Sequence, residues 1–137
     1  MAQTPIDQRI VDEFFKLSAS PKTQDQAWLF GLIATFGLTP DKLYPFTWTT
    51  DGHLAIPARK RPLSALHPQW PILFNLVKKK PTKTQWKEMC HGLYCQMAHQ
   101  KVELNVTDLT LAHRLRKEHY KSAKGRLPIR IQELKMG

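Results

Sequence analysis

Lysine and arginine side chains gather in three stretches of the chain, and the chemistry open to them is contact with phosphate. Two stretches are runs of three, Arg59, Lys60 and Arg61 and then residues 78–80. A single run of charge is often only solvated surface. Three clusters beside apolar segments are more typical of a surface that follows a phosphate backbone. The third cluster comprises Arg114, Arg116, Lys117, Lys121, Lys124 and Arg126.

The charge balance of the whole chain points the same way. Its 21 Lys and Arg outnumber 11 Asp and Glu, which gives a formal charge of +10 and a pI near 9.9. Hydrophobic residues make up 42%, close to the globular norm, so a folded body carries the charge. Such an excess calls for a partner of opposite sign. We expect a polyanion, with duplex DNA as the first candidate.

Two cysteines and two histidines lie close together and raise the question of a metal site. Cys95 and His99 have the i, i+4 spacing of one helix face, whereas Cys90 and His91 are expected to point elsewhere. The chain has no paired-cysteine spacing of the zinc-knuckle type. A Cys90–Cys95 disulfide is not expected, because the two side chains would leave the helix on different faces. We therefore expect neither a metal site nor a cofactor.

Other catalytic signatures are missing from the sequence. It contains no glycine-rich phosphate loop, nucleophile elbow or paired-carboxylate motif. The first 15 residues lack the basic start and apolar run of a signal peptide, and no apolar stretch approaches the roughly 18 residues that span a bilayer. We expect a cytoplasmic protein without a membrane partner, associated with the nucleoid if it binds DNA.

Apolar spacing predicts a mainly α domain with a small antiparallel β-sheet. Residues 46–49 and 53–56 alternate around Asp51-Gly52 as in a hairpin, and residues 63–66 are a possible third strand. Gly37 stands where the second helix should end, and Thr107 or Asp108 is the expected cap of a later one. Helices are predicted near residues 6–15, 28–36, 68–76, 86–97, 107–120 and 129–134.

The size of the chain suits one domain over residues 1–137, since this length buries one core but not two sizeable ones. The tryptophans fall mostly in apolar patterns, so we expect core anchors and not base-stacking platforms. They are Trp28, Trp48, Trp70 and Trp86.

In order along the chain, several segments resemble the catalytic domain of tyrosine recombinases, the phage-integrase family. Residues 28–43 (WLFGLIATFGLTPDKL) are similar to that family's helix and "GLRPxEL" signature. The hairpin, the basic run at 59–61 and residues 66–68 (LHP) resemble its "K…R…PLHP" region. Residues 112–116 (AHRLR) resemble its "HxLR" box, and residues 125–137 resemble the segment leading to its "LGH". Order and approximate spacing agree over about 110 residues.

The resemblance implies a set of site residues. The family's chemistry needs cations around a scissile phosphate, a general acid for the leaving oxygen and a tyrosine that attacks. By position, Lys60 would be the hairpin lysine, and His113 and Arg116 the histidine and arginine of the box. The residues expected to contact DNA are Arg59, Lys60, Arg61, Arg114, Lys117 and Lys121.

The chain departs from the family's pattern at several positions. Thr39 stands where the signature has its first catalytic arginine, and a hydroxyl cannot grip phosphate as a bidentate cation does. Lys117 replaces the usual histidine after the box, and the sequence ends at Gly137, before the nucleophilic tyrosine. Tyr120 is too close to the box to replace it. A shifted alignment, with residues 111–113 on "LRH", keeps the histidine but puts Ala112 at the arginine position.

Three readings of function follow. The first is a degenerate or truncated recombinase-like domain that is incomplete at its C-terminus. It would bind duplex DNA without cleaving and rejoining it, either alone or as a homo-oligomer on the DNA. The second is a fragment of an active site-specific tyrosine recombinase, although truncation does not account for Thr39. The third is a basic protein-interaction or regulatory module with an acidic protein partner. RNA binding ranks below these, because RNP-type strands and a GXXG loop are missing.

Overall fold

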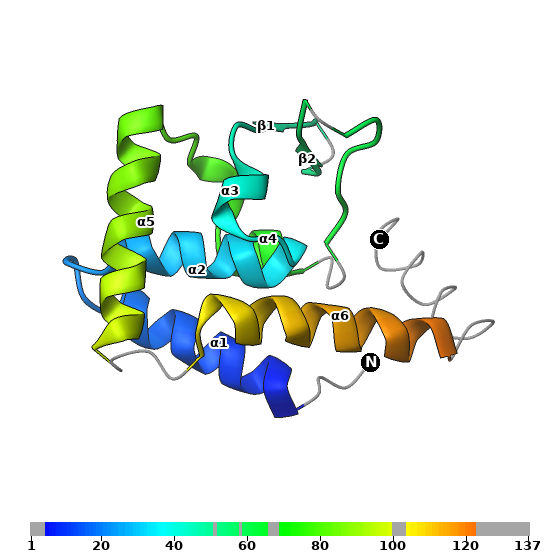
Figure 1. Cartoon of the computed structure of the whole chain (residues 1–137), viewed down its shortest axis with the longest axis horizontal. Coiled ribbons are helices and arrows are strands. Elements are labelled where there is room, and N and C mark those ends of the chain that lie inside the picture. Colours follow the sequence, from blue (N-terminus) through cyan, green and yellow to red (C-terminus); the bar gives the residue numbers. More distant parts are fainter. Residues whose placement is uncertain (1–4, 51, 58, 66–68, 100–103, 123–137) are drawn as a thin grey trace.

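The computed structural model describes residues 5–50, 52–57, 59–65, 69–99 and 104–122, and these form a mainly helical domain with one small sheet (Figure 1). The predicted fold class is confirmed at this level. The elements are α1 (Pro5–Ser18), α2 (Gln24–Phe36), α3 (Pro40–Leu43), β1 (Thr47–Trp48), β2 (Leu54–Ala55), α4 (Trp70–Leu73), the 3₁₀ helix η1 (Leu76–Lys78), α5 (Lys83–Ala98) and α6 (Val106–Ser122).

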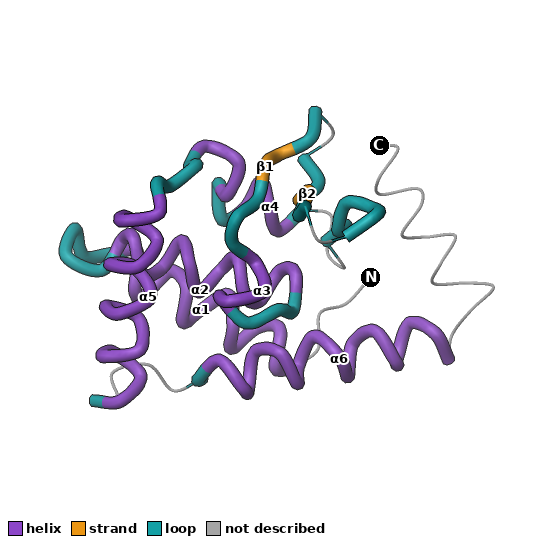
Figure 2. The backbone as a smooth tube through the Cα atoms, turned by 45° about the horizontal axis from the view of Figure 1, so that its top comes forward, coloured by secondary structure: helices purple, strands orange, loops and turns teal. Residues whose placement is uncertain are grey.

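The α2 helix forms the centre of the core. Every side chain from Ala27 to Phe36 is buried, as expected for a helix that is apolar on all sides. It packs against α1, α5 and α6, and Figures 1 and 2 show α6 running alongside it while α5 crosses near one end. Its buried hydroxyl, on Thr35, donates to the carbonyl of Gly31 at 2.7 Å. The hydroxyl of Thr35 is therefore hydrogen-bonded although it lies inside the apolar core.

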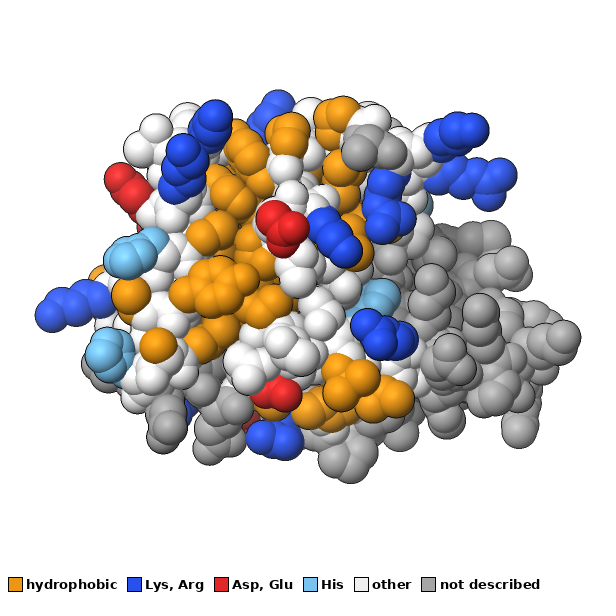
Figure 3. All heavy atoms as spheres, in the orientation of Figure 1, with side chains coloured by type: hydrophobic (Ala, Val, Ile, Leu, Met, Phe, Trp, Pro, Cys, Tyr) orange, Lys and Arg blue, Asp and Glu red, His pale blue; other side chains and the backbone are white. Residues whose placement is uncertain are grey.

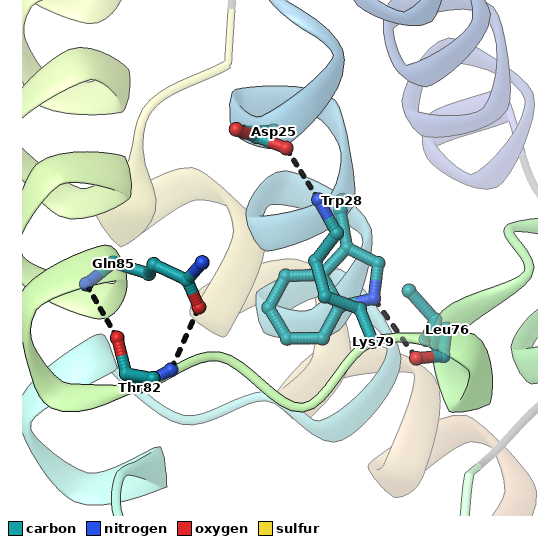
Figure 4. A network of polar contacts seen from close by, with 6 residues as sticks. All are labelled: Asp25, Trp28, Leu76, Lys79, Thr82 and Gln85. Atoms are coloured by element: carbon teal, nitrogen blue, oxygen red, sulfur yellow. Dashed lines mark hydrogen bonds and ion pairs between the residues drawn. The ribbon is translucent and has the colours of Figure 1, made fainter.

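Two helix ends follow rules that are readable in the sequence. The α2 helix ends at Gly37, whose φ of 73° is the left-handed conformation and whose N–H donates to the carbonyl of Ile33 at 2.7 Å. At the start of α5, Thr82 and Gln85 form a reciprocal capping box. Both bonds of that box are drawn in Figure 4.

The predicted cap of α6 is wrong. Asn105 Oδ1 accepts from the backbone N–H of Asp108 at 2.8 Å, and Asp108 Oδ2 accepts from the N–H of Asn105 at 3.0 Å. Asn105 is therefore the cap, while Thr107 and Asp108 lie in the first turn. The two polar residues after the cap misled the prediction, because Asp108 serves as the return arm of the capping box.

The hairpin is present but shorter than predicted. β1 and β2 pair antiparallel, with Thr47 opposite Ala55 and Trp48 opposite Leu54. The proposed third strand is reduced to one antiparallel bridge at Leu63, which exchanges backbone bonds of 3.0 and 2.8 Å with Leu54. The sheet therefore consists of two short strands and one added bridge. Residues 66–68 lie outside the described residues.

The helix predicted over residues 68–76 is divided in the structure into α4 and η1. Asn75 has a φ of 53°, and this left-handed residue interrupts the helical hydrogen bonds. The indole of Trp28 donates to the carbonyl of Leu76 at 2.9 Å, and that of Trp48 donates to Lys79 at 3.1 Å. These two bonds hold the segment after α4 against the core.

Three of the four tryptophans are core anchors, as predicted. Trp28, Trp70 and Trp86 are buried, whereas Trp48 is only half-buried at the base of the hairpin. The helix predicted at residues 129–134 lies outside the described residues. Among the helices that the structure describes, none has the length and apolar character needed to cross a membrane.

Candidate nucleic-acid interface

The cations at residues 59–61 occupy the connection between β2 and the bridge residue Leu63. Paired backbone bonds between Leu54 and Leu63 close this connection into a loop, and the N–H of Arg59 donates to Ile56 at 2.9 Å inside it. Arg59, Lys60 and Arg61 are all exposed. The loop therefore presents three positive charges to solvent from a closed backbone frame.

The end of α2 meets the middle of α6 at a close approach between Gly37 and His113. A Cβ added at Gly37 would overlap the imidazole ring and lie 2.8 Å from the Cβ of His113. The positive φ of Gly37 also disfavours any other residue there. Two segments far apart in the sequence, residues 37–40 and 112–116, are thereby brought into contact at one point.

Thr39 lies two residues after Gly37 and is the N-cap residue of α3. Its backbone carbonyl accepts from the N–H groups of Lys42 and Leu43 at 2.9 and 3.2 Å, and its side chain is half-buried. One turn later, Lys42 is exposed. Lys42 is not predictable as a site residue from the sequence, because a lone lysine outside a run carries no signal. It is the cation that the fold places on the same short helix as Thr39.

The α6 helix carries the remaining predicted site residues. His113 is half-buried against Gly37, whereas Arg114 beside it is exposed. Ala112, the arginine position in the shifted alignment, is buried at 3% exposure. Arg116, Lys117 and Lys121 belong to α6 by their backbone, and their side chains lie outside the described part of the structure, as do Lys124 and Arg126 altogether.

The lysine run at residues 78–80 is partly engaged in the fold. Lys79 forms an ion pair with Asp25 at the start of α2 (Figure 4). The backbone carbonyl of Lys79 accepts a hydrogen bond from the indole of Trp48. Lys80 is exposed. The central lysine of this predicted cluster is therefore paired with Asp25.

One face of the molecule, drawn in Figure 3, carries Lys and Arg side chains at many points around its edge and few acidic ones. An apolar patch lies between them.

Tyr94 is 47% exposed, and burial, followed by the charges of Cys90 and Asp41, raises its pKa above the ordinary value. Its phenol O–H can donate and accept hydrogen bonds.

The cysteine and histidine cluster differs from its predicted arrangement. His91 does not point away: its Nε2 lies 3.6 Å from the Sγ of Cys95, one helical turn along α5. Both cysteines are free, and burial raises the pKa of Cys90. Within the described residues, no group of three or more His, Cys, Asp or Glu side chains is arranged to hold a metal ion.

Comparisons with protein-family models, with curated proteins and with solved structures found no match for this chain.

Proposed function

We propose that this chain is a DNA-binding domain of the tyrosine-recombinase type that does not itself cleave DNA. The observation that carries the proposal is the contact between Gly37 and His113. It joins the two segments that resemble the family's arginine signature and its "HxLR" box. In a recombinase these segments share one phosphate, so they must lie together, and a chance resemblance would not require their contact.

The loop at residues 59–61 supports the same proposal. Its backbone frame joins β2 to Leu63, and this is the position in the chain order where the resemblance puts the hairpin lysine, Lys60. Arg59 and Arg61 flank it with exposed charges. Exposed Lys and Arg side chains that contact phosphates release counterions from DNA, which gives strong, salt-dependent and largely sequence-independent binding.

The absence of cleavage follows from Thr39. A recombinase stabilises the charge on the scissile phosphate with a bidentate arginine, and the hydroxyl of threonine has no positive charge. Lys42, one turn along α3, is exposed and can attract phosphate as a point charge. It does not reproduce the planar pair of N–H donors. We therefore infer that the fold retains affinity for the DNA backbone without the geometry for strand transfer.

The test is binding to a fluorescent duplex of random sequence across a salt series. The triple variant R59A/K60A/R61A should bind more weakly, and the slope of log K against log salt should become shallower by about 0.9 for each lost phosphate contact. The matched control is K16A/K22A/K87A, which removes the same charge from exposed positions on other parts of the chain. Equal weakening by both variants would refute the assigned surface, and no binding at low salt would refute DNA binding.

Cleavage is tested separately with supercoiled plasmid. The native chain should leave the plasmid supercoiled, because it lacks the arginine at position 39. Nicked or relaxed plasmid that accumulates with the purified chain would overturn the inactive part of the proposal. A Lys60→Ala variant serves as the control for a contaminating nuclease, whose activity would not depend on this residue.

A further inference from the structure

His91 and Cys95 form a pair on α5 that the DNA-binding proposal does not use. They are spaced i, i+4, so both side chains rise from the same face of the helix. The His91 Nε2 and Cys95 Sγ atoms are 3.6 Å apart. His91 is exposed and Cys95 is half-buried, so an ion can reach both from solvent.

This separation matches the bite of a tetrahedral zinc ion. With Zn–S near 2.3 Å and Zn–N near 2.0–2.1 Å, tetrahedral geometry puts the sulfur and nitrogen about 3.5–3.6 Å apart. The separation of the two atoms therefore suits a shared ion. We propose that His91 Nε2 and Cys95 Sγ form a bidentate half-site for a thiophilic ion of the zinc(II) class, with the other coordination positions open to solvent.

The neighbouring residues define which cysteine and histidine serve as ligands. Cys90 is the less suitable thiol, because it is adjacent to His91 in the chain and its side chain leaves the helix in a different direction, whereas Cys95 lies one turn along on the same face. His99 is exposed and is also one turn from Cys95, on its other side. As the C-cap residue of α5, however, it lies two turns from His91, too far along the helix for one ion to join all three.

The experiment is titration of the full reduced chain with cobalt(II), which substitutes for zinc in thiolate sites and gives a sulfur-to-cobalt absorption band. The native chain should develop the band, and zinc(II) should displace it. Cys95→Ser should abolish the band, and His91→Gln should weaken cobalt binding at least about tenfold, more than the loss of a supporting residue costs. Cys90→Ser and His99→Gln are the matched controls and should retain it.

The cobalt titration does not depend on DNA binding, so its result is independent of the proposed function. A band that persists in Cys95→Ser, or one that is lost equally in Cys90→Ser, would overturn the assignment. Full affinity in His91→Gln would reduce the site to a single thiol and would also overturn it. Circular dichroism of each variant checks that the helix is intact. One ion per chain is the expected stoichiometry. One ion per two chains would mean that a second copy completes the coordination, and it would overturn the assignment of a half-site open to solvent.

Discussion

The α2 helix and the loop that carries Arg59, Lys60 and Arg61 are held in the molecule in different ways. All residues from Ala27 to Phe36 are buried, so α2 is fixed from every side by apolar packing. The loop is fixed at its base by the backbone bridge between Leu54 and Leu63, and its cationic side chains are exposed. A side chain in α2 therefore acts on stability, whereas a side chain in the loop is free to serve binding.

The sharpest test of the buried side of this comparison is Phe30→Ala. Phe30 is fully buried in α2, and its loss leaves a cavity, so the free energy of unfolding should fall by about 3–5 kcal/mol. Chemical denaturation measures the change. Phe15→Ala is the control, because Phe15 is 45% exposed and should cost much less. Equal costs would mean that α2 is not the centre of the core.

Gly37→Ala tests the point where the end of α2 meets α6. The left-handed φ alone should cost about 1–2 kcal/mol of unfolding free energy, and overlap with the imidazole of His113 should add to it. In a His113→Ala background the same substitution should cost less, because the ring atoms are gone. A double-mutant cycle measures this coupling. A cycle with no coupling would show that Gly37 and His113 are not in contact in solution.

Asn105→Ala should have a smaller effect, confined to the start of α6. It removes the side-chain acceptor for the N–H of Asp108 and should lower the free energy of unfolding by about 1 kcal/mol. Thr107→Ala is the paired control and should be nearly neutral if Asn105 is the cap. Thermal unfolding of both variants measures the difference. A larger cost for Thr107→Ala would place the cap where the sequence pattern suggested it.

The smallest expected change in stability per substituted residue belongs to the loop. R59A/K60A/R61A should shift the free energy of unfolding by no more than about 0.5 kcal/mol for each residue, since exposed charges away from partners contribute little. The measurement is denaturation of the same sample used for DNA binding. A large loss of stability in this variant would contradict the division between a buried core and an exposed binding edge, and would make its weaker DNA binding uninformative.

Much of the helical fold was predictable from local rules. The apolar residues 28–36 and the glycine after them predicted the buried part of α2 and its stop, since a left-handed residue is accommodated best by glycine. The helix begins one turn earlier than predicted, at Gln24. The errors occurred where a short-range signal had two readings. Asp108 resembles a cap but is the third residue after one, and Asn75 interrupts a segment whose apolar spacing predicted one continuous helix.

The candidate site was less accessible to sequence reasoning. The charge runs at residues 59–61 and 114–126 were visible as composition, but the engagement of Lys79 by Asp25 was not, because these residues are distant in the chain. Lys42 gave no signal because it is a lone lysine outside any run. The His91–Cys95 pair had the correct spacing, but the spacing alone does not choose rotamers. Their 3.6 Å approach is a property of the two side chains as they pack on α5.

The sequence by itself therefore determined the helical class, the net positive charge and the order of the elements, because each depends on composition or on neighbours within a few residues. Tertiary structure alone decided that Gly37 meets His113, that Trp28 and Trp48 hold the segment at residues 76–79, and which cations remain exposed. These outcomes depend on contacts between residues far apart in the chain. Such contacts form only when α1, α5 and α6 pack against α2 in the folded chain.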